Sequence, residues 1–218
     1  AVDAAVLADA LAAELQALRR MPIEAVFNRF PRMIRELAHE LGKQVSLQTL
    51  GPELEVDRAL ADELSDLLVH LLRNAVDHGL EGPAERHEAG KGAVGTLQLA
   101  ARREGNTLIL TVGDDGRGIA PAKLRDTAVA RGVLKANEAE RLDDDAALQL
   151  IFDAGFTTND VTTRISGRGV GLDAVKRKVE ALGGRLSVDS TPGRGTIFQL
   201  RFPMRQELGP RPDARVGA

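Results

Sequence analysis

The stretch "HLLRNAVDHG", residues 70–79, lies inside the leucine-rich run "ELSDLLVHLLRNAVDHGLEG" of residues 63–82. Its leucines recur at spacings of three and four, which predicts a helix over residues 58–78 with one apolar face. Beside that face, at 100° per residue, lies an arc of polar side chains: His70, Arg73, Asn74 and Asp77, with His78 at its edge. Asn, Asp and His form helices less readily than the Lys and Glu of a typical solvated face. We therefore expect a packed helix that presents a compact polar strip, although this segment alone also allows an ordinary surface strip.

Length and composition narrow the class of protein. The chain has 218 residues, enough for one sizeable α/β core and an extra element. A net charge of −3 and the absence of Trp and Tyr argue against nucleic-acid binding. The lack of cysteine excludes disulfides and thiol nucleophiles and fits a reducing compartment. No apolar run approaches the roughly 18 residues of a membrane span, so no membrane insertion is expected. The first residue is Ala rather than Met, which suggests a fragment or a processed chain.

Periodicity and turn residues predict the other elements of the first half. Residues 2–20 form an amphipathic helix whose apolar face packs on its own domain or on a second copy. We further expect a helix from about Pro31 to Gly42, a strand at 44–49, a polar loop at 81–95, and a hairpin of strands 96–101 and 106–112.

The second half is expected to close the same sheet. The sequence predicts helices at 121–131, 144–152 and 171–182, then two strands joined by a Pro/Gly turn. In the last strand Phe198, Leu200 and Phe202 should face one way, and Ile197, Gln199 and Arg201 the other. This order of elements predicts a mixed sheet with helices on one face.

Two glycine-rich segments are further candidates for ligand binding beside the polar strip. "GDDGRGI" (113–119) follows a strand directly, and its glycines allow a flat ligand to approach the backbone. "SGRGVGLDAVKR" (166–177) runs into a helix, and bare N–H groups at a helix start suit phosphate. Each segment alone is also compatible with an ordinary turn or loop.

The three segments in this order resemble the N, G1 and G2 boxes of the superfamily that joins DNA gyrase, heat-shock chaperones, mismatch-repair proteins and histidine kinases. "TPGRGTIFQLRFP" resembles the closing strand of the histidine kinases. "FNRFPRMIRELAHELGK", "HLLRNAVDHGLEGPAERHEAGK" and "GRGVGLDAVKRKVEALGG" resemble the CheA-type chemotaxis kinases. The resemblance covers about residues 10–203. It implies an α/β two-layer sandwich, with a helical segment at 1–42 (a dimerisation-helix remnant and linker) and an ATP-binding kinase domain at 43–204. The composition of the tail at 205–218 predicts disorder.

The resemblance also implies roles for individual residues. Asn74 would hold Mg²⁺ and act with His70 in catalysis. Asp114 would accept from the adenine amino group, with Thr196 helping to hold adenine and Asp115 forming the turn. The other implied nucleotide-binding residues are His70, Arg73, Asp77, His78, Gly116, Gly118, Lys123, Ser166, Gly167, Arg168, Gly169, Val170, Gly171 and Leu172. Phe152 and Phe156 would anchor a lid over ATP.

Finally, the resemblance implies an activity and partners. Gyrase-like hydrolases carry a glutamate four residues before the Asn, and His70 at that position favours a kinase. The kinase would be cytoplasmic and would transfer the γ-phosphoryl group of Mg-ATP to a histidine on a separate phosphotransfer domain. Its further partners would be a response regulator, a coupling protein, a chemoreceptor array and, in the full-length protein, a second copy. The alternatives are a nucleotide-binding scaffold without turnover, an ATP hydrolase, and a conventional kinase with His39 as acceptor. His87 is expected in a solvated loop.

Overall fold

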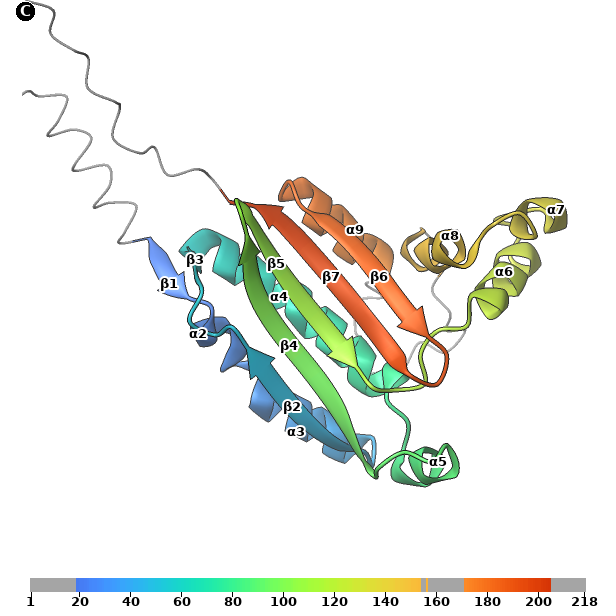
Figure 1. Ribbon diagram of the computed structural model, residues 1–218, viewed down its shortest axis with the longest axis horizontal. Coiled ribbons are helices and arrows are strands. Elements are labelled where there is room, and N and C mark those ends of the chain that lie inside the picture. The colour runs from blue at the N-terminus through green and yellow to red at the C-terminus, as the bar shows by residue number, and fades with distance from the viewer. Residues whose placement is uncertain (1–18, 154–155, 157–170, 205–218) are drawn as a thin grey trace, which may run out of the picture.

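The computed structural model describes residues 19–153, 156 and 171–204. Its centre is a five-stranded sheet in the order β2-β4-β5-β7-β6 (Figure 1). The pair β2–β4 is parallel, and the other three neighbouring pairs are antiparallel, so the predicted mixed sheet is confirmed. The strands are β2 (Gln44–Leu50), β4 (Val94–Glu104), β5 (Thr107–Asp114), β6 (Arg185–Thr191) and β7 (Gly195–Pro203).

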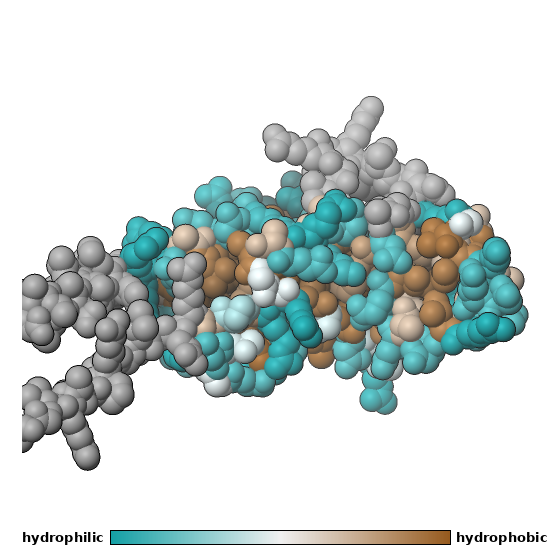
Figure 2. Space-filling model, turned by 90° about the horizontal axis from the view of Figure 1, so that it is seen from above, coloured by the Kyte–Doolittle hydropathy of each residue, from teal (hydrophilic) through white to brown (hydrophobic). Residues whose placement is uncertain are grey.

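Helices cover one face of this sheet, as the predicted fold class requires (Figure 1). They are α3 (Phe30–Glu40), α4 (Arg58–Asn74) and α9 (Leu172–Ala181), and the short α2 (Glu24–Phe27) packs on α4. Hydrophobic residues lie between rims of hydrophilic ones when the two layers are seen from above (Figure 2). The buried core takes side chains from α2 and α3 as well as from α4, α9 and the sheet.

The last strand shows how the sequence pattern sets the two faces of the sheet. Phe198, Leu200 and Phe202 are at most 6% exposed and face the helices, whereas Ile197 is 47% exposed. This alternation is the predicted one, because side chains two residues apart share a face. The helix predicted near Pro31 is also confirmed, with the proline in its first turn.

The end of α4 departs from a regular α-helix. The carboxylate of Asp57 caps its start by accepting from the N–H of Ala59 at 2.8 Å. At the other end the chain widens into a π-helical turn, η1 (Ala75–Gly79), closed by the N–H of Leu80 donating to the carbonyl of Ala75 at 2.8 Å. Such a turn adds a residue and redirects the side chains that follow it, and π turns are frequent at functional sites.

A second group of helices lies beyond the end of β6 (Figure 1). The helices predicted at 121–131 and 144–152 are confirmed, the second with a 3₁₀ end. The structure adds a four-residue helix that the sequence did not reveal. The elements are α6 (Pro121–Ala130), α7 (Ala136–Ala139), α8 (Asp144–Gln149) and η2 (Leu150–Phe152).

Two expectations need correction. The segment predicted as a polar loop contains α5 (Pro83–Glu88), and its Arg86 is 2% exposed. The last residue of the predicted helix 2–20, Arg20, instead begins a short strand, β1 (Arg20–Pro22), which pairs with β3 (Glu55–Asp57). Residues 1–18, 157–170 and 205–218, which include most of that helix and the predicted tail, lie outside the described residues. Within the described part of the chain, no helix is both long and apolar enough to cross a membrane.

Candidate functional site

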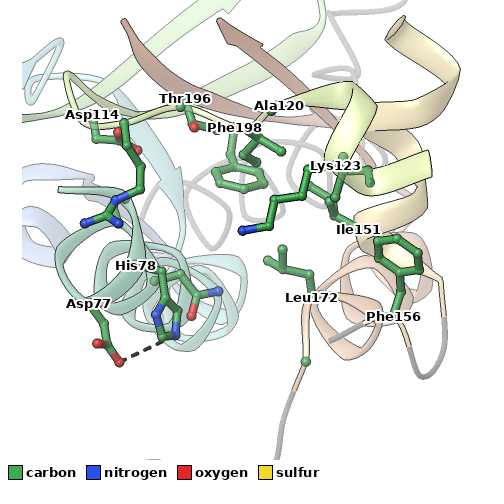
Figure 3. A pocket seen from close by; sticks show the side chains of 18 of the residues that line it. Asp77, His78, Asp114, Ala120, Lys123, Ile151, Phe156, Leu172, Thr196 and Phe198 are labelled. Atoms are coloured by element: carbon green, nitrogen blue, oxygen red, sulfur yellow. Dashed lines mark ion pairs between the residues drawn. The ribbon is translucent and has the colours of Figure 1, made fainter. Parts of the chain in front are cut away.

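A pocket of about 500 Å³ opens at the end of the sheet where α4 and β5 stop. The end of α4 with η1 forms one wall, α6 a second, and the ends of β5 and β7 the floor between them (Figure 3). The start of α9 and the segment after η2 complete it. Elements from five separate parts of the sequence therefore meet around one cavity.

The polar strip of the long helix supplies the first wall. His70, Asn74, Asp77 and His78 all line the pocket, but Arg73 does not. Burial lowers the pKa of His70, and the charge of Arg73 lowers it further, so its imidazole is neutral at pH 7. Asp77 and His78, from the π turn η1, line the same cavity as Asn74, with His78 Nε2 3.5 Å from a carboxylate oxygen of Asp77.

Asp114, the last residue of β5, places a carboxylate in the floor of the pocket. Its Oδ1 accepts from the N–H of Gly116 at 2.9 Å. Burial raises the pKa of Asp114 to about 6, against the opposing effect of hydrogen bonds from the N–H groups of Gly116 and Thr196. The molecule thus holds a desolvated acceptor facing the cavity, which suits a ligand that donates N–H groups.

The glycines that follow Asp114 are required mainly by neighbouring chain segments. A Cβ on Gly116 would lie 2.1 Å from the carbonyl oxygen of Gly79, and this glycine does not line the pocket. Gly118 does line the pocket, but it has φ +65° and its Cβ would lie 2.2 Å from the carbonyl oxygen of Thr191. The predicted close approach therefore occurs between two parts of the backbone as well as beside the cavity.

Thr196, at the start of β7, faces the pocket beside Asp114 and is 4% exposed (Figure 3). Its hydroxyl lies 2.9 Å from that of Ser190 on β6. The Ser190 hydroxyl also accepts from the N–H of Ile119 at 2.8 Å. One serine therefore links the strand that carries Thr196 to the glycine-containing loop after β5.

Lys123 extends from α6 into the open side of the cavity (Figure 3). Gly171 and Leu172 line the pocket at the start of α9, and the first turn of a helix attracts anions through its N–H groups. The remaining predicted phosphate-binding residues, Ser166, Gly167, Arg168, Gly169 and Val170, lie outside the described residues.

The two phenylalanines predicted to anchor the lid are both buried, at 3% and 1% exposure for Phe152 and Phe156. Phe156 lines the pocket opposite Asp114, next to Leu172 (Figure 3). Phe152 packs edge-on against Phe198 with ring centroids 6.3 Å apart. The packing joins the segment that precedes residue 157 to the inner face of β7.

Several lining residues were missed from the sequence. Some are apolar, and the alternation of inward-facing residues in β7 and the helical pattern of α6 could have identified them from the sequence. Others lie in the pocket only because of how the loops fold, and no sequence pattern marks them. The missed residues are Ala75, Gly79, Arg117, Ile119, Ala120, Leu124, Thr127, Ile151, Asp153, Asp173 and Phe198.

Comparison with known proteins places this geometry in a family. The model described as "Histidine kinase-, DNA gyrase B-, and HSP90-like ATPase" matches residues 59–206, which contain every element of the pocket. The chain belongs to this family of ATPases.

Individual relatives point to one branch of the family. The chain is 48% identical to the chemotaxis protein CheA of Bacillus subtilis over 187 residues, 86% of this chain and 28% of that protein. It is 42% identical to the sensor histidine kinase CheAY of Helicobacter pylori over 85% of this chain and 23% of that protein. The resemblance to CheA-type kinases is thereby confirmed, and the chain spans only about a quarter of these relatives.

Solved structures support the fold independently. A mycobacterial sensor histidine kinase, MprB, superposes with a TM-score of 0.52 at 18% identity, over 86% of this chain and 98% of that one. At this identity the likeness concerns the fold alone, and it matches the two-layer arrangement of sheet and helices.

The side chains of the pocket fit the Mg²⁺ ion that would accompany the nucleotide implied by the family name. Among the described residues, no three His, Asp or Glu side chains gather closely enough to cage a metal ion. Mg²⁺ commonly takes one or two protein oxygens and completes its shell with waters and substrate phosphates. The single amide of Asn74 in the pocket wall suits an ion of that kind.

Proposed function

We propose that this chain is the catalytic domain of a chemotaxis-type protein-histidine kinase that uses Mg-ATP. The observation that carries the proposal is the division of one cavity into two chemical ends. A partly buried carboxylate, Asp114, lies in the floor, while Asn74, Lys123 and the start of α9 offer a metal ligand, a cation and the N–H groups of a helix start. This arrangement suits adenine at one end and a magnesium triphosphate at the other.

Transfer to a protein histidine is favoured over hydrolysis by the residue four positions before Asn74. That residue is His70, whose lowered pKa keeps it neutral, whereas the hydrolases of the superfamily carry a carboxylate there. In phosphoryl transfer the protein mainly positions the reactants and neutralises charge. His70, Asn74 and Lys123 would supply that environment, and Mg²⁺ would neutralise charge on the phosphates.

The acceptor is proposed to be a histidine on a separate phosphotransfer domain. Of the four histidines, His70 and His78 line the pocket, and His39 and His87 lie exposed on α3 and α5. By analogy with the CheA relatives, a response regulator, a coupling protein, chemoreceptors and a second copy of the chain are proposed as further partners. A cytoplasmic location follows from the same analogy.

The test is transfer of label from γ-labelled ATP. With Mg²⁺, the wild-type chain should label its partner phosphotransfer domain, and Asn74→Ala should reduce the rate at least a hundredfold with an unchanged fold. Asn137→Ala, on exposed α7, is the matched control and should keep the wild-type rate. Wild-type transfer by Asn74→Ala would refute the metal assignment.

Two other outcomes would change the assigned function. Mg²⁺-dependent ATP binding without transfer to any phosphotransfer domain would identify a nucleotide-binding scaffold. Acid-labile labelling of the chain itself that disappears in His39→Gln would make His39 the acceptor and the protein a conventional histidine kinase.

A further inference from the structure

A partly buried charge cluster lies directly behind the loop that follows Asp114. It consists of Glu81, Arg86 and Lys91, from the segment around α5, together with Asp115. Arg86 and Glu81 are 2% and 7% exposed. None of the four lines the pocket, so the cluster belongs to a layer beneath the site.

Asp115 is held by a two-pronged contact with Arg86. The two terminal guanidinium nitrogens donate to its two carboxylate oxygens at 3.1 and 2.9 Å. The N–H of Thr96 on β4 donates to the same carboxylate at 2.8 Å. Paired N–H groups of an arginine fix a carboxylate in both position and plane. Asp115 is therefore locked to the scaffold and turned away from the cavity.

The cations of the cluster also donate hydrogen bonds to the backbone of this loop. Lys91 Nζ donates to the carbonyl oxygens of Asp115 and Gly116 at 3.0 and 2.7 Å, and Arg86 donates to the first of these at 3.3 Å. Glu81 accepts from both cations, at 2.8 Å from Lys91 and 3.2 Å from Arg86. Among the described residues every buried side-chain nitrogen and oxygen has a hydrogen-bond partner, so the cluster is fully satisfied.

One peptide group connects this cluster to the pocket. The carbonyl oxygen of Asp115 and the N–H of Gly116 belong to the same planar unit. Its carbonyl end accepts from Arg86 and Lys91, and its N–H end donates to Asp114 Oδ1 at 2.9 Å. Because the unit is rigid, fixing one end sets the direction of the other. Two cations at the carbonyl also polarise the peptide and strengthen its N–H as a donor.

We propose that Lys91 and Arg86 are positioning residues for base recognition: through the 115–116 peptide they aim the Asp114 carboxylate at the amino group of adenine. The inference rests on the proposed binding of ATP in this pocket. It assigns a role to the α5 segment, which would act on specificity without touching the nucleotide. Glu81 balances the two cations, and its pKa lies below the usual range because Lys91 and Arg86 outweigh the effect of burial.

The experiment compares ATP with purine riboside triphosphate, which lacks only the 6-amino group, by calorimetric titration with Mg²⁺. The preference is the ratio of the two dissociation constants. Wild type should prefer ATP. In Lys91→Met, ATP affinity should fall about tenfold while the analogue stays within about twofold, so most of the preference is lost. Lys91→Arg, which keeps a cation and its donors, should retain the preference within about threefold.

Lys178→Met is the matched control, since Lys178 contacts two carboxylates, Glu63 and Asp66, away from the pocket. It should leave both dissociation constants unchanged. A Lys91→Met protein that keeps the wild-type preference, or loses affinity for both nucleotides equally, would overturn the proposal. If Lys91→Met does not fold, Asp115→Asn, which removes the charge held by Arg86, decides by the same ratio.

The outcome separates this inference from the proposed function. A wild-type chain that does not bind ATP, or an Asp114→Asn variant that keeps the preference, would refute adenine recognition by Asp114 itself. Wild-type preference that depends on Asp114 but not on Lys91 or Asp115 would refute only the positioning role.

Discussion

Asp114→Asn should make the protein more stable and a weaker binder of ATP at the same time. Burial raises the pKa of this carboxyl from 3.8 to about 6, so the folded state disfavours its charged form. At about 1.4 kcal/mol for each pH unit, the difference amounts to about 3 kcal/mol. The asparagine amide keeps an oxygen for the N–H of Gly116 and carries no charge. We therefore expect the free energy of unfolding at pH 8 to rise by up to about 3 kcal/mol.

The dependence on pH follows from the direction of the shift. A carboxyl whose pKa is raised on folding takes up a proton more readily in the folded state. The wild type should therefore gain stability as the pH falls through about 6. The gain should be complete only below about 3, where Asp114 is protonated in both states. Relative to Asp114→Asn, the deficit of the wild type should be full at pH 8 and reduced to about a fifth of that value near pH 4.

The assay is urea unfolding of both proteins between pH 4 and 8, with and without Mg-ATP. Losing a charge-assisted hydrogen bond should weaken ATP binding tenfold to a hundredfold, from about 1.5–3 kcal/mol. ATP at a thousand times the wild-type Kd adds about 4 kcal/mol to the wild type, but only about 1.4 kcal/mol to a variant that binds a hundredfold more weakly. The ligand should thus nearly close the gap in stability.

A variant less stable than the wild type at pH 8 would refute this reasoning. It would mean that hydrogen bonds from Gly116 and Thr196 to the charged carboxylate outweigh its desolvation. An ATP effect of equal size in both proteins would show that Asp114 does not contact the base.

Two further substitutions test what supports the site. Lys43→Met removes an ammonium that donates at 2.7 Å to two carbonyl oxygens of the π turn. The free energy of unfolding should therefore fall by about 1–3 kcal/mol, and ATP binding should weaken. Urea unfolding identical to that of the wild type would contradict this. Gly116→Ala would place a Cβ 2.1 Å from the carbonyl oxygen of Gly79 and should lower the free energy of unfolding by at least about 2 kcal/mol. Gly92→Ala, which has open space around it, should leave the melting temperature unchanged. Equal melting temperatures for the two alanine variants would contradict the close packing.

Where the local sequence pattern reflects burial directly, the sequence was sufficient to predict the element and its buried face. The period of leucines in α4 and the alternation in β7 both reflect which side of an element packs inward. The polar strip of α4 could be read for the same reason, since a helix fixes the angle between residues. Arg73 shows the limit, because it lies on the strip but outside the pocket. Arg73 lies in the regular part of α4, on the side of the strip away from His78, and periodicity alone does not show how far around the helix the pocket extends.

The segment around α5 could not be predicted from its own residues. "PAERHEAGKG" has the charge and the glycines of a solvated loop. The burial of Arg86 depends on Asp115, which lies 29 residues further along the chain. A buried arginine is stable only when its partners are in place. Local composition therefore favoured a surface loop, and long-range pairing decided otherwise.

The glycine pattern after Asp114 correctly predicted a loop beside the pocket, but the predicted role of these glycines was incomplete. It was expected to make room for a flat ligand, yet the space beside Gly116 is taken by the carbonyl of Gly79 at the end of the π turn. That carbonyl also accepts from the N–H of Arg117 at 2.9 Å. The helix end and the loop are thus joined backbone to backbone, with no side chain between them. Because main-chain contacts vary less than side-chain rotamers, this join holds Asp114 at a fixed position relative to Asn74. The two chemical ends of the pocket therefore keep their spacing before any nucleotide binds.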